Sequence, residues 1–392
     1  MKIIWLVNGL GNAMFQYAAY LQLKKMYPDE EVFVDTIWYE LTGYPYELDR
    51  IFQLHTDDID IHKIIERSHG ISFEEKLEQF RVWKEYGYGT FIDLWNAVVG
   101  KENCGCDTEA GRCATLLGVW NYLELPALEQ PYLEPFSVVF SHGKYSFADI
   151  LQKRKKNVTP DVPLSPVQRF VKELWRNKNG IGYQVARAMG NPYKRKKLAE
   201  DILHARRPDL SGFPPLERFR IEGNTYYLYH ALPNDCEGIR DELLKAFAFP
   251  AFTTTENIEA ARQMQNCNSV AIHARVVHYG YGMGNIAERG YYPKAIRYIR
   301  ERVPNIRFFL FSDDPTWCRE NLAVLGLTEN DAITFIDWNK GEESYRDMQL
   351  ISLCKHQIIP NSTFSWWGGF LNQNPEKIIV TPYGTLPGTI SL

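Results

Sequence analysis

Polar side chains that could bind an anion or a sugar recur after short β-rich runs in the last third of the chain. His273 and Arg275 follow the first run, Asp313 and Asp314 follow the second, and Asp337 follows the third. The fourth run leads into Asn361-Ser-Thr-Phe-Ser-Trp-Trp-Gly-Gly369. The guanidinium fork of an arginine can bind two oxygen atoms of a phosphate or carboxylate at once. These residue types predict a site for a polar, anionic ligand.

Each of these residues also has a structural interpretation. Arg275 could form an ion pair with a neighbouring aspartate, and ion pairs of this kind resemble sites. His273 could be a hydrogen-bonded core histidine, and Asp314 could cap a helix that starts at Pro315. Polar residues after four of five strands are harder to explain by structure alone. The ligand site is therefore the favoured interpretation.

The runs that carry these residues alternate with helix-length segments. Strands are predicted at 269–274, 307–311, 333–336, 357–360 and 377–381, and helices at 291–303, 315–325, 344–355 and 363–372. Such alternation is typical of a parallel sheet covered by helices on both faces. Ligands of open parallel sheets bind beyond the carboxyl ends of the strands, where the polar residues follow. We predict a doubly wound α/β domain over 256–392.

The N-terminus predicts the start of a second α/β unit. Residues 3–7 are a predicted strand, 13–26 a helix with Asn12 as its N-cap, and 31–35 a second strand. Gly9-Leu-Gly11 lacks the third glycine of a dinucleotide fingerprint because Met14 stands there. An NAD-dependent oxidoreductase is accordingly disfavoured.

The middle of the chain has the least regular pattern. Residues 40–250 are aromatic-rich and interrupted by prolines, and we expect them to be mostly helical. We place residues 1–255 in an N-terminal domain. The stretch 151–220 holds 17 basic against 6 acidic residues, although the whole chain has a net charge of −4. It is either a solvated helical face or a segment attracted to an anionic inner membrane leaflet or lipid-linked acceptor.

Composition excludes several classes of protein. The 392 residues are 45% hydrophobic and 23% charged, which is ordinary for a globular protein and unlike a disordered chain. Apolar runs are too short to span a bilayer, and no signal-like segment follows Met1. We therefore expect a soluble, cytoplasmic protein. We also expect peripheral contact with the inner membrane. Neither the cluster of Cys104, Cys106 and Cys113 nor the D-x-D pair Asp58 and Asp60 has a convincing metal-site context, so we expect no metal.

Several motifs resemble glycosyltransferase family 11, the α-1,2-fucosyltransferases. Residues 8–18 are similar to the N-terminal signature G-G-L-G-N-Q-M-F-Q-Y-A, and residues 311–318 also match. The strongest resemblance is in residues 347–368, which end in N-S-T-F-S-W-W-G. The resemblance covers about residues 1–35 and 268–384.

This resemblance implies a GT-B-like fold of two Rossmann-type domains with a poorly matched, helical middle region. It places the acceptor in the domain of residues 1–255 and the nucleotide-sugar in that of 256–392. It implies metal-independent, inverting transfer of fucose from GDP-fucose to the 2-hydroxyl of a galactose in a surface glycan or oligosaccharide. No cofactor and no nucleic acid partner are expected. By the same resemblance, His273 and Arg275 would hold the diphosphate of the donor, and Asp313 and Asp347 would contact the guanosine. Thr363 and Ser365, with neighbouring Ser362, would contact the phosphate or ribose. Gly11 and Asn12 would face the donor from across the cleft. Arg275 and His273 would also act in catalysis, because GDP leaves with developing negative charge.

One motif departs from the family pattern. The family reads H-x-R-R-G-D-Y where this chain has Val276, Val277 and His278 in place of arginine, glycine and aspartate. The change leaves two alternatives open. One is a transferase that uses another GDP-sugar, and the other is a non-catalytic protein that binds a nucleotide-sugar or a glycan.

Overall fold

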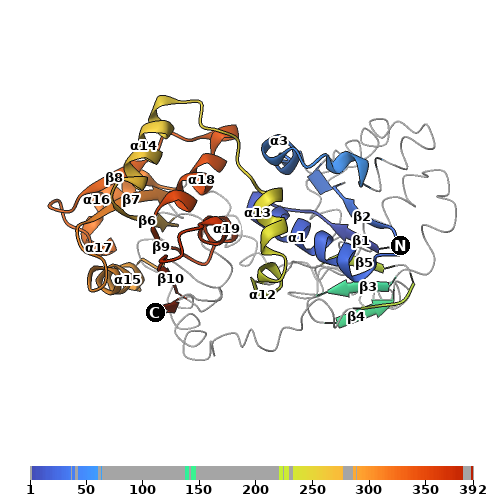
Figure 1. Cartoon of the computed structure of the whole chain (residues 1–392). Helices are drawn as coiled ribbons and strands as arrows, with labels where there is room; N and C mark the ends of the chain where they lie inside the picture. Colours follow the sequence, from blue (N-terminus) through green and yellow to red (C-terminus); the bar gives the residue numbers. More distant parts are fainter. Residues whose placement is uncertain are drawn as a thin grey trace, which may run out of the picture. The chain divides into compact units, whose positions relative to one another are not determined.

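The computed structural model describes residues 2–36, 38–39, 43–60, 63, 137–140, 143–146, 220–223, 225–228, 233–276, 286–287, 289–382 and 390–391. They belong to one compact unit made of residues 1–151 and 214–392. Two sheets with helices around them form this unit (Figure 1). The expected α/β class with two Rossmann-type sheets is confirmed. The predicted boundary between residues 255 and 256 falls at the start of a helix in this unit and stays a prediction.

The C-terminal sheet is parallel throughout, in the order β11-β10-β9-β6-β7-β8. Its strands are β6 (Asn268–Ala274), β7 (Ile306–Ser312), β8 (Ile333–Ile336), β9 (His356–Ile358), β10 (Ile379–Thr381) and β11 (Ile390–Ser391). The five predicted strands agree with β6 to β10 within two residues at each end. Central β6 pairs with β7 on one side and β9 on the other. Strands β7 and β8 are added on one side of β6, and β9, β10 and β11 on the other, so the strand order reverses between β6 and β9.

Helices cover both faces of this sheet. They are α14 (Thr255–Gln265), α15 (Tyr291–Arg300), α16 (Pro315–Glu320), α17 (Leu322–Leu325), α18 (Tyr345–Leu353) and α19 (Thr363–Leu371). Successive strand residues point to opposite faces, and β6 shows this directly. Ile272 shares a buried apolar cluster with Ile296 of α15, whereas the adjacent Ala271 shares another with Met264 of α14.

The helix predicted over 315–325 is two helices, because the chain breaks at Asn321. This residue has φ −124° and ψ 35°, and its side-chain amide donates a 2.8 Å hydrogen bond to the carbonyl oxygen of Trp317. A side chain that satisfies a helix carbonyl competes with continuation of the helix. The second helix then ends at Gly326, whose φ of +78° favours glycine.

Two tyrosines at the start of α15 hold the ends of three strands. The hydroxyl of Tyr291 lies 2.8 Å from the carbonyl oxygens of both Ile359 and Val380. The hydroxyl of Tyr292 donates a 2.9 Å hydrogen bond to the carbonyl oxygen of His273. All of these groups are buried, so α15 fixes the backbone where β6, β9 and β10 end.

The N-terminal sheet has the order β2-β1-β5-β3-β4 and is parallel except for the β3–β4 pair. The strands are β1 (Lys2–Trp5), β2 (Val32–Asp35), β3 (Ser137–Phe140), β4 (Gly143–Ser146) and β5 (Thr225–Leu228). The sequence analysis found β1 and β2 but missed β3, β4 and β5, which lie in the region expected to be mostly helical. Each of the three is only four residues long.

Helix α1 (Leu10–Met26) starts earlier than predicted, which corrects the assignment of Asn12 as its N-cap. Gly9 occupies the N-cap position, and Asn12 lies in the first turn with its N–H donating to the Gly9 carbonyl oxygen at 2.9 Å. Most side chains of α1 are buried on every face. It therefore lies between β1 and further buried elements instead of presenting one face to solvent.

The remaining described elements are α3 (Leu48–Phe52), η1 (Thr56–Asp58), α12 (Pro233–Glu237), α13 (Arg240–Ala246) and η5 (Gly341–Glu343). One buried apolar cluster contains side chains of α1, α13, α18 and α19. Within it the ring of Phe15 lies 4.5 Å from that of Trp366 and 4.8 Å from that of Trp367, between centroids. This cluster joins the start of the chain to its C-terminal sheet.

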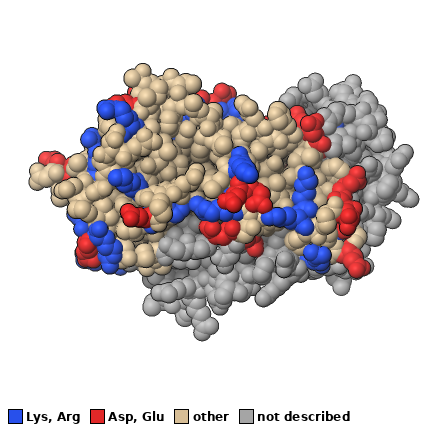
Figure 2. Space-filling view, in the orientation of Figure 1, with Lys and Arg blue, Asp and Glu red and all other residues tan. Residues whose placement is uncertain are grey.

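The described surface carries charges of both signs. Figure 2 shows lysine and arginine side chains interspersed with acidic ones on the face in view. Of the basic stretch 151–220, only Arg220 is among the described residues. Across the described ranges, no helix combines the length and apolar character that a bilayer crossing requires.

Candidate functional site

The candidate site lies where β6 and β9 end side by side. These strands are neighbours in the sheet, but the chain connects them through β7 and β8 on the far side of β6. Ligands of open α/β sheets bind at such a reversal, beyond the carboxyl ends of the two strands. Arg275 follows β6, and Ser362 and Thr363 follow β9. The strand-end prediction therefore converges on one place.

The side chain of Arg275 lies between two residues that follow different strands, Asp313 after β7 and Ser362 after β9. Its Nη1 donates a 3.4 Å hydrogen bond to Ser362 Oγ, and its Nε lies 4.0 Å from Asp313 Oδ2. Asp313 Oδ1 also accepts a 2.8 Å hydrogen bond from the backbone N–H of Val276. The side chain of Arg275 is 35% exposed, so it can reach a ligand while Asp313 orients it.

His273 contributes a neutral imidazole. Burial, and then the charge of Arg275, lower its pKa from 6.5 to about 3. Its Nδ1 has no hydrogen-bond partner among the described residues, although the side chain is buried. The ring centroid lies 6.0 Å from that of Phe364 in the first turn of α19. His273 can therefore offer one further hydrogen bond, but it adds no positive charge.

The N-termini of two helices meet at this edge. A Cβ on Gly11, in the first turn of α1, would lie 2.7 Å from both Phe364 N and Thr363 C. Trp367 Nε1 donates a 2.9 Å hydrogen bond to the Gly11 carbonyl oxygen. Backbone N–H groups at a helix N-terminus and the helix dipole favour bound anions. The close approach needs glycine and brings both positive ends near Arg275 and Ser362.

The contacts bring together most of the predicted site residues. His273, Arg275, Asp313 and Ser362 are linked by the interactions above, and Gly11 touches Thr363. Ser365 is buried, and its hydroxyl lies 3.4 Å from the Ser362 carbonyl oxygen within its own helix. Asn12 is half-buried next to Gly11. The alternative role of Asp314 is confirmed, because its Oδ1 caps α16 by accepting a 2.9 Å hydrogen bond from Trp317 N.

Asp347 belongs to a separate, half-buried hydrogen-bond network. Its Oδ1 accepts a 2.8 Å hydrogen bond from Asn339 Nδ2, and Asn339 Oδ1 accepts another of 2.8 Å from Asn257. The indole of Trp338 donates to Asn257 Oδ1 at 2.9 Å. Burial raises the pKa of Asp347 from 3.8 to about 7, while the Asn339 hydrogen bond opposes the shift and the charge of Asp337 adds to it.

Sequence reasoning missed the partners of Asp347. Trp338 and Asn339 follow β8, and the strand-end rule extended by two residues beyond Asp337 would have included them. Asn257 lies on α14 and carries no such signal. Asp337, which the rule did find, forms a 2.5 Å ion pair with Arg319.

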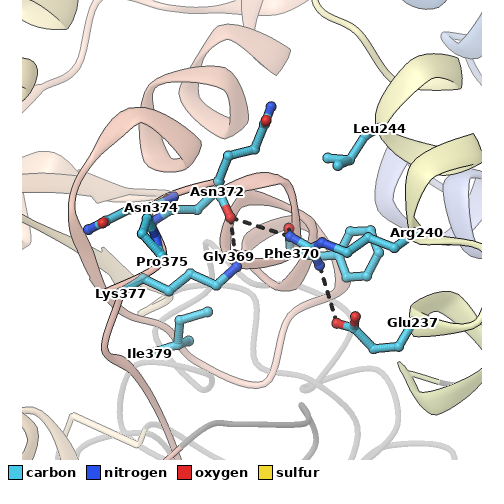
Figure 3. Close-up of a pocket in the computed structure, with 11 residues that line it drawn as sticks. Glu237, Arg240, Leu244, Gly369, Phe370, Asn372, Asn374, Pro375, Lys377 and Ile379 are labelled. Atoms are coloured by element: carbon cyan, nitrogen blue, oxygen red, sulfur yellow. Dashed lines mark hydrogen bonds and ion pairs between the residues drawn. The ribbon is translucent and has the colours of Figure 1, made fainter.

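A cavity lies at the opposite end of α19 and is shown in Figure 3. It has a volume of about 460 Å³ and is lined by residues that include Arg240, Phe370 and Lys377. Lys377 Nζ donates to the carbonyl oxygens of Gly369 (3.1 Å) and Asn372 (2.6 Å), and Arg240 Nη2 donates to that of Phe370 (2.7 Å). The two cations thus satisfy carbonyl groups at the C-terminus of α19, about 13 Å from Thr363 along the helix. We assign them a structural role.

The metal-site candidates stand as follows. Asp60 is buried and accepts a hydrogen bond from the Thr36 hydroxyl, and Asp58 belongs to η1. Among the described residues no three His, Cys, Asp or Glu side chains gather as metal ligands would. The cluster of Cys104, Cys106 and Cys113 lies outside those residues, as do Val277 and His278.

Comparison with known proteins gives a consistent set of matches. Residues 210–385 match glycosyl transferase family 11. An α-1,2-colitosyltransferase of Escherichia coli is 34% identical over 146 residues, which are 36% of this chain and 49% of that protein. The galactoside 2-alpha-L-fucosyltransferase SEC1 of Bos taurus is 28% identical over 187 residues, 45% of this chain and 47% of that protein. The chain thus spans about half the length of these relatives.

A solved structure is also similar to the chain. It is that of NodZ alpha-1,6-fucosyltransferase co-crystallized with GDP, with a TM-score of 0.39 and 15% identity over 98% of this chain and 95% of that one.

Proposed function

We propose that the protein transfers fucose from GDP-fucose to the 2-hydroxyl of a galactose in a glycan or oligosaccharide, as the match of residues 210–385 to glycosyl transferase family 11 suggests. The observation that carries the proposal is the position of Arg275, between Asp313 and Ser362 at the point where the strand order reverses. Such a position suits the diphosphate of a sugar nucleotide.

In the proposed donor complex, the diphosphate lies against Arg275 and the N-terminus of α19. Arg275 supplies the charge, and Ser362 and Thr363 supply hydroxyl groups at the first turn of the helix. His273 supplies one hydrogen bond through its buried nitrogen. Asp347 lies beyond the end of β8 and would accept hydrogen bonds from the guanine base.

Catalysis follows from the charge that develops on the leaving group. As the bond between fucose and GDP breaks, negative charge grows on the diphosphate, and Arg275 and the helix N-termini are already in place to stabilise it. A preorganised cation can do this without a metal ion, so we propose metal-independent transfer. Direct attack by the acceptor hydroxyl on the opposite face of the sugar gives inversion, and the hydroxyl proton passes to a general base.

One relative and one motif favour an alternative donor sugar. The Escherichia coli relative is named for the transfer of a different sugar, colitose, and Val276 to His278 replace a family motif beside Arg275. The second candidate function is therefore transfer from another GDP-sugar at the same site.

The proposed partners extend to a membrane. Residues 151–220 are strongly basic in the sequence, and such segments are attracted to anionic lipid surfaces. We propose that this segment brings the protein, in the cytoplasm, to the inner membrane, where a lipid-linked glycan is presented. Loss of cosedimentation with anionic vesicles when the lysines and arginines of 153–156 and 194–197 are replaced by glutamine would support this.

Calorimetric titration with GDP and UDP, first without metal and then with magnesium, tests the donor half of the proposal. We expect metal-independent binding of GDP in preference to UDP, followed by release of GDP when GDP-fucose and a β-galactoside are mixed with the protein. Arg275→Ala should strongly reduce both signals, and Arg262→Ala on the exposed face of α14 is the matched control. Failure of the wild-type protein to bind GDP would overturn the proposal, and binding without turnover of any GDP-sugar would favour a non-catalytic protein.

A further inference from the structure

Four aromatic side chains form a cluster beyond the end of β2. They are Trp38, Tyr39, Tyr44 and Tyr46, and each ring contacts at least one other. The Trp38 centroid lies 5.4 Å from that of Tyr44 and 5.1 Å from that of Tyr39. Tyr39 is buried and Trp38 half-buried, whereas Tyr44 is 45% exposed. Among the described residues, Tyr44 is the one exposed aromatic side chain.

The cluster is fixed to the backbone that precedes α1. Tyr39 donates a 2.8 Å hydrogen bond to the carbonyl oxygen of Asn8, whose φ of 67° turns the chain into the helix. The Tyr44 hydroxyl lies 3.2 Å from the position of a Cβ on Gly9. The aromatic cluster therefore occupies a defined position at the carboxyl edge of the N-terminal sheet, where ligands of open sheets bind.

A carboxylate lies beside the same segment. Glu47 accepts a hydrogen bond from the backbone N–H of Leu10, and its Oε1 lies 3.1 Å from Arg50 Nη2. Its side chain is 15% exposed. Burial raises the pKa of Glu47, while Arg50 and Leu10 oppose that shift. Glu47 still has lone pairs that can accept a hydrogen bond from a ligand hydroxyl.

The aromatic cluster is close to the candidate donor site through one residue. Gly11 follows the segment at residues 8–10 and touches Thr363 and Phe364 at the start of α19. The contact between Gly11 and the start of α19 therefore lies between the aromatic cluster and the candidate donor site at Arg275 and Ser362. The candidate donor site is polar and cationic, whereas the aromatic cluster offers apolar ring faces with a carboxylate nearby.

We propose that Tyr44 and Trp38 form a platform for a pyranose ring of the acceptor glycan, with Glu47 accepting a hydrogen bond from one of its hydroxyl groups. Aromatic rings pack against the apolar C–H face of a sugar, and the carboxylate recognises the polar rim. The ligand class is a neutral hexose, which needs no cation. This inference rests on the proposed function, since it assigns the acceptor side of the same reaction.

The test compares acceptor and donor parameters in Tyr44→Ala, with lactose as the acceptor probe. We expect the KM for lactose to rise tenfold or more, while kcat changes less than threefold and GDP affinity stays within twofold. Tyr44→Phe keeps the ring and should remain within threefold of wild type. Ile258→Ala removes another exposed apolar side chain, on α14, and should change nothing.

Direct binding separates this inference from the proposed function. Ligand-observed saturation-transfer NMR of lactose with GDP present should show contact with the wild-type protein and none with Tyr44→Ala. Tyr44→Leu answers the same question if the alanine variant fails to fold. An unchanged KM or lactose signal in these variants overturns the platform, as does parallel loss of GDP affinity. Absence of GDP binding by the wild type would instead overturn the proposed function.

Discussion

The indole nitrogen of Trp367 donates a 2.9 Å hydrogen bond to the carbonyl oxygen of Gly11, joining residues 356 positions apart. Both residues are buried, so water cannot replace this bond. Trp367 also contacts the ring of Phe15 on the same face of α1. The first and last long helices of the described chain are therefore held together beside the residues proposed to bind the donor.

Gly11→Ala tests this contact. The added methyl group would meet backbone atoms of Thr363 and Phe364 at 2.7 Å, and backbone cannot rotate away as a side chain can. We expect a loss of about 1–3 kcal/mol in the free energy of unfolding, which is typical of overpacking, measured by urea denaturation. GDP affinity should fall as well, because α19 must move.

Gly238→Ala is the control for this substitution. Its new Cβ would lie 3.4 Å from the Asp235 carbonyl oxygen, an ordinary contact. We expect the stability and GDP affinity of this variant to match those of wild type. Equal behaviour of the two glycine variants would contradict the importance of the helix contact.

Arg275→Ala should weaken GDP binding by about 2 kcal/mol or more, roughly 30-fold, because the variant leaves the diphosphate without its cation. Arg275→Lys should recover only part of this affinity, since an ammonium group cannot make the two parallel hydrogen bonds of a guanidinium. Calorimetry measures both variants. Full recovery by lysine would show that charge alone suffices.

Asp347→Asn should remove a pH dependence of stability. The pKa of Asp347 is about 7 in the folded state and near 4 in the unfolded state. Between these two pH values the folded protein therefore holds a proton that the unfolded protein has lost. The contribution of Asp347 to stability is therefore complete below about pH 4 and is lost as pH rises through 7. Relative to wild type, the variant should gain about 1–3 kcal/mol between pH 4 and pH 8 in urea unfolding. A constant difference across that range would refute the raised pKa.

His273 should produce the opposite pH dependence. Its folded-state pKa of about 3 lies below the unfolded value near 6.5, so the unfolded protein binds the proton more readily. Its contribution to stability is present above about pH 6.5 and is lost as pH falls towards 3. His273→Phe should therefore lose less stability than wild type between pH 6.5 and pH 4.5. NMR titration of the wild-type imidazole would show the same property as an unprotonated ring at pH 5.

Sequence patterns predicted the C-terminal sheet well because its units are local. Each strand is followed by its own helix, and the apolar residues repeat with the periods of those elements, so β6 to β10 were found within two residues. The break at Asn321 was missed because it depends on one side-chain hydrogen bond. Strands β3 and β5 were missed because they lie in the aromatic-rich, proline-interrupted region that shows no such alternation, and each pairs with a partner distant in sequence.

The candidate site was predictable only in part. Arg275 and Ser362 follow strands that meet where the strand order reverses, so their proximity could be expected from the pattern alone. The contact of Gly11 with Thr363 depends on how two distant helices pack, which no local pattern specifies. The same holds for Asn257, which reaches Asp347 through Asn339 from another helix.

The tyrosine hydroxyls at the start of α15 fix the ends of three strands through backbone carbonyl groups. They secure the backbone at the ends of β6, β9 and β10 from behind the sheet, independently of the side chains that follow those strands. The position of Arg275, directly after β6, is therefore set by buried backbone contacts and not by the residues that follow it in the chain. Substitutions beyond Arg275 can therefore change which ligand the proposed site prefers without displacing the strand ends.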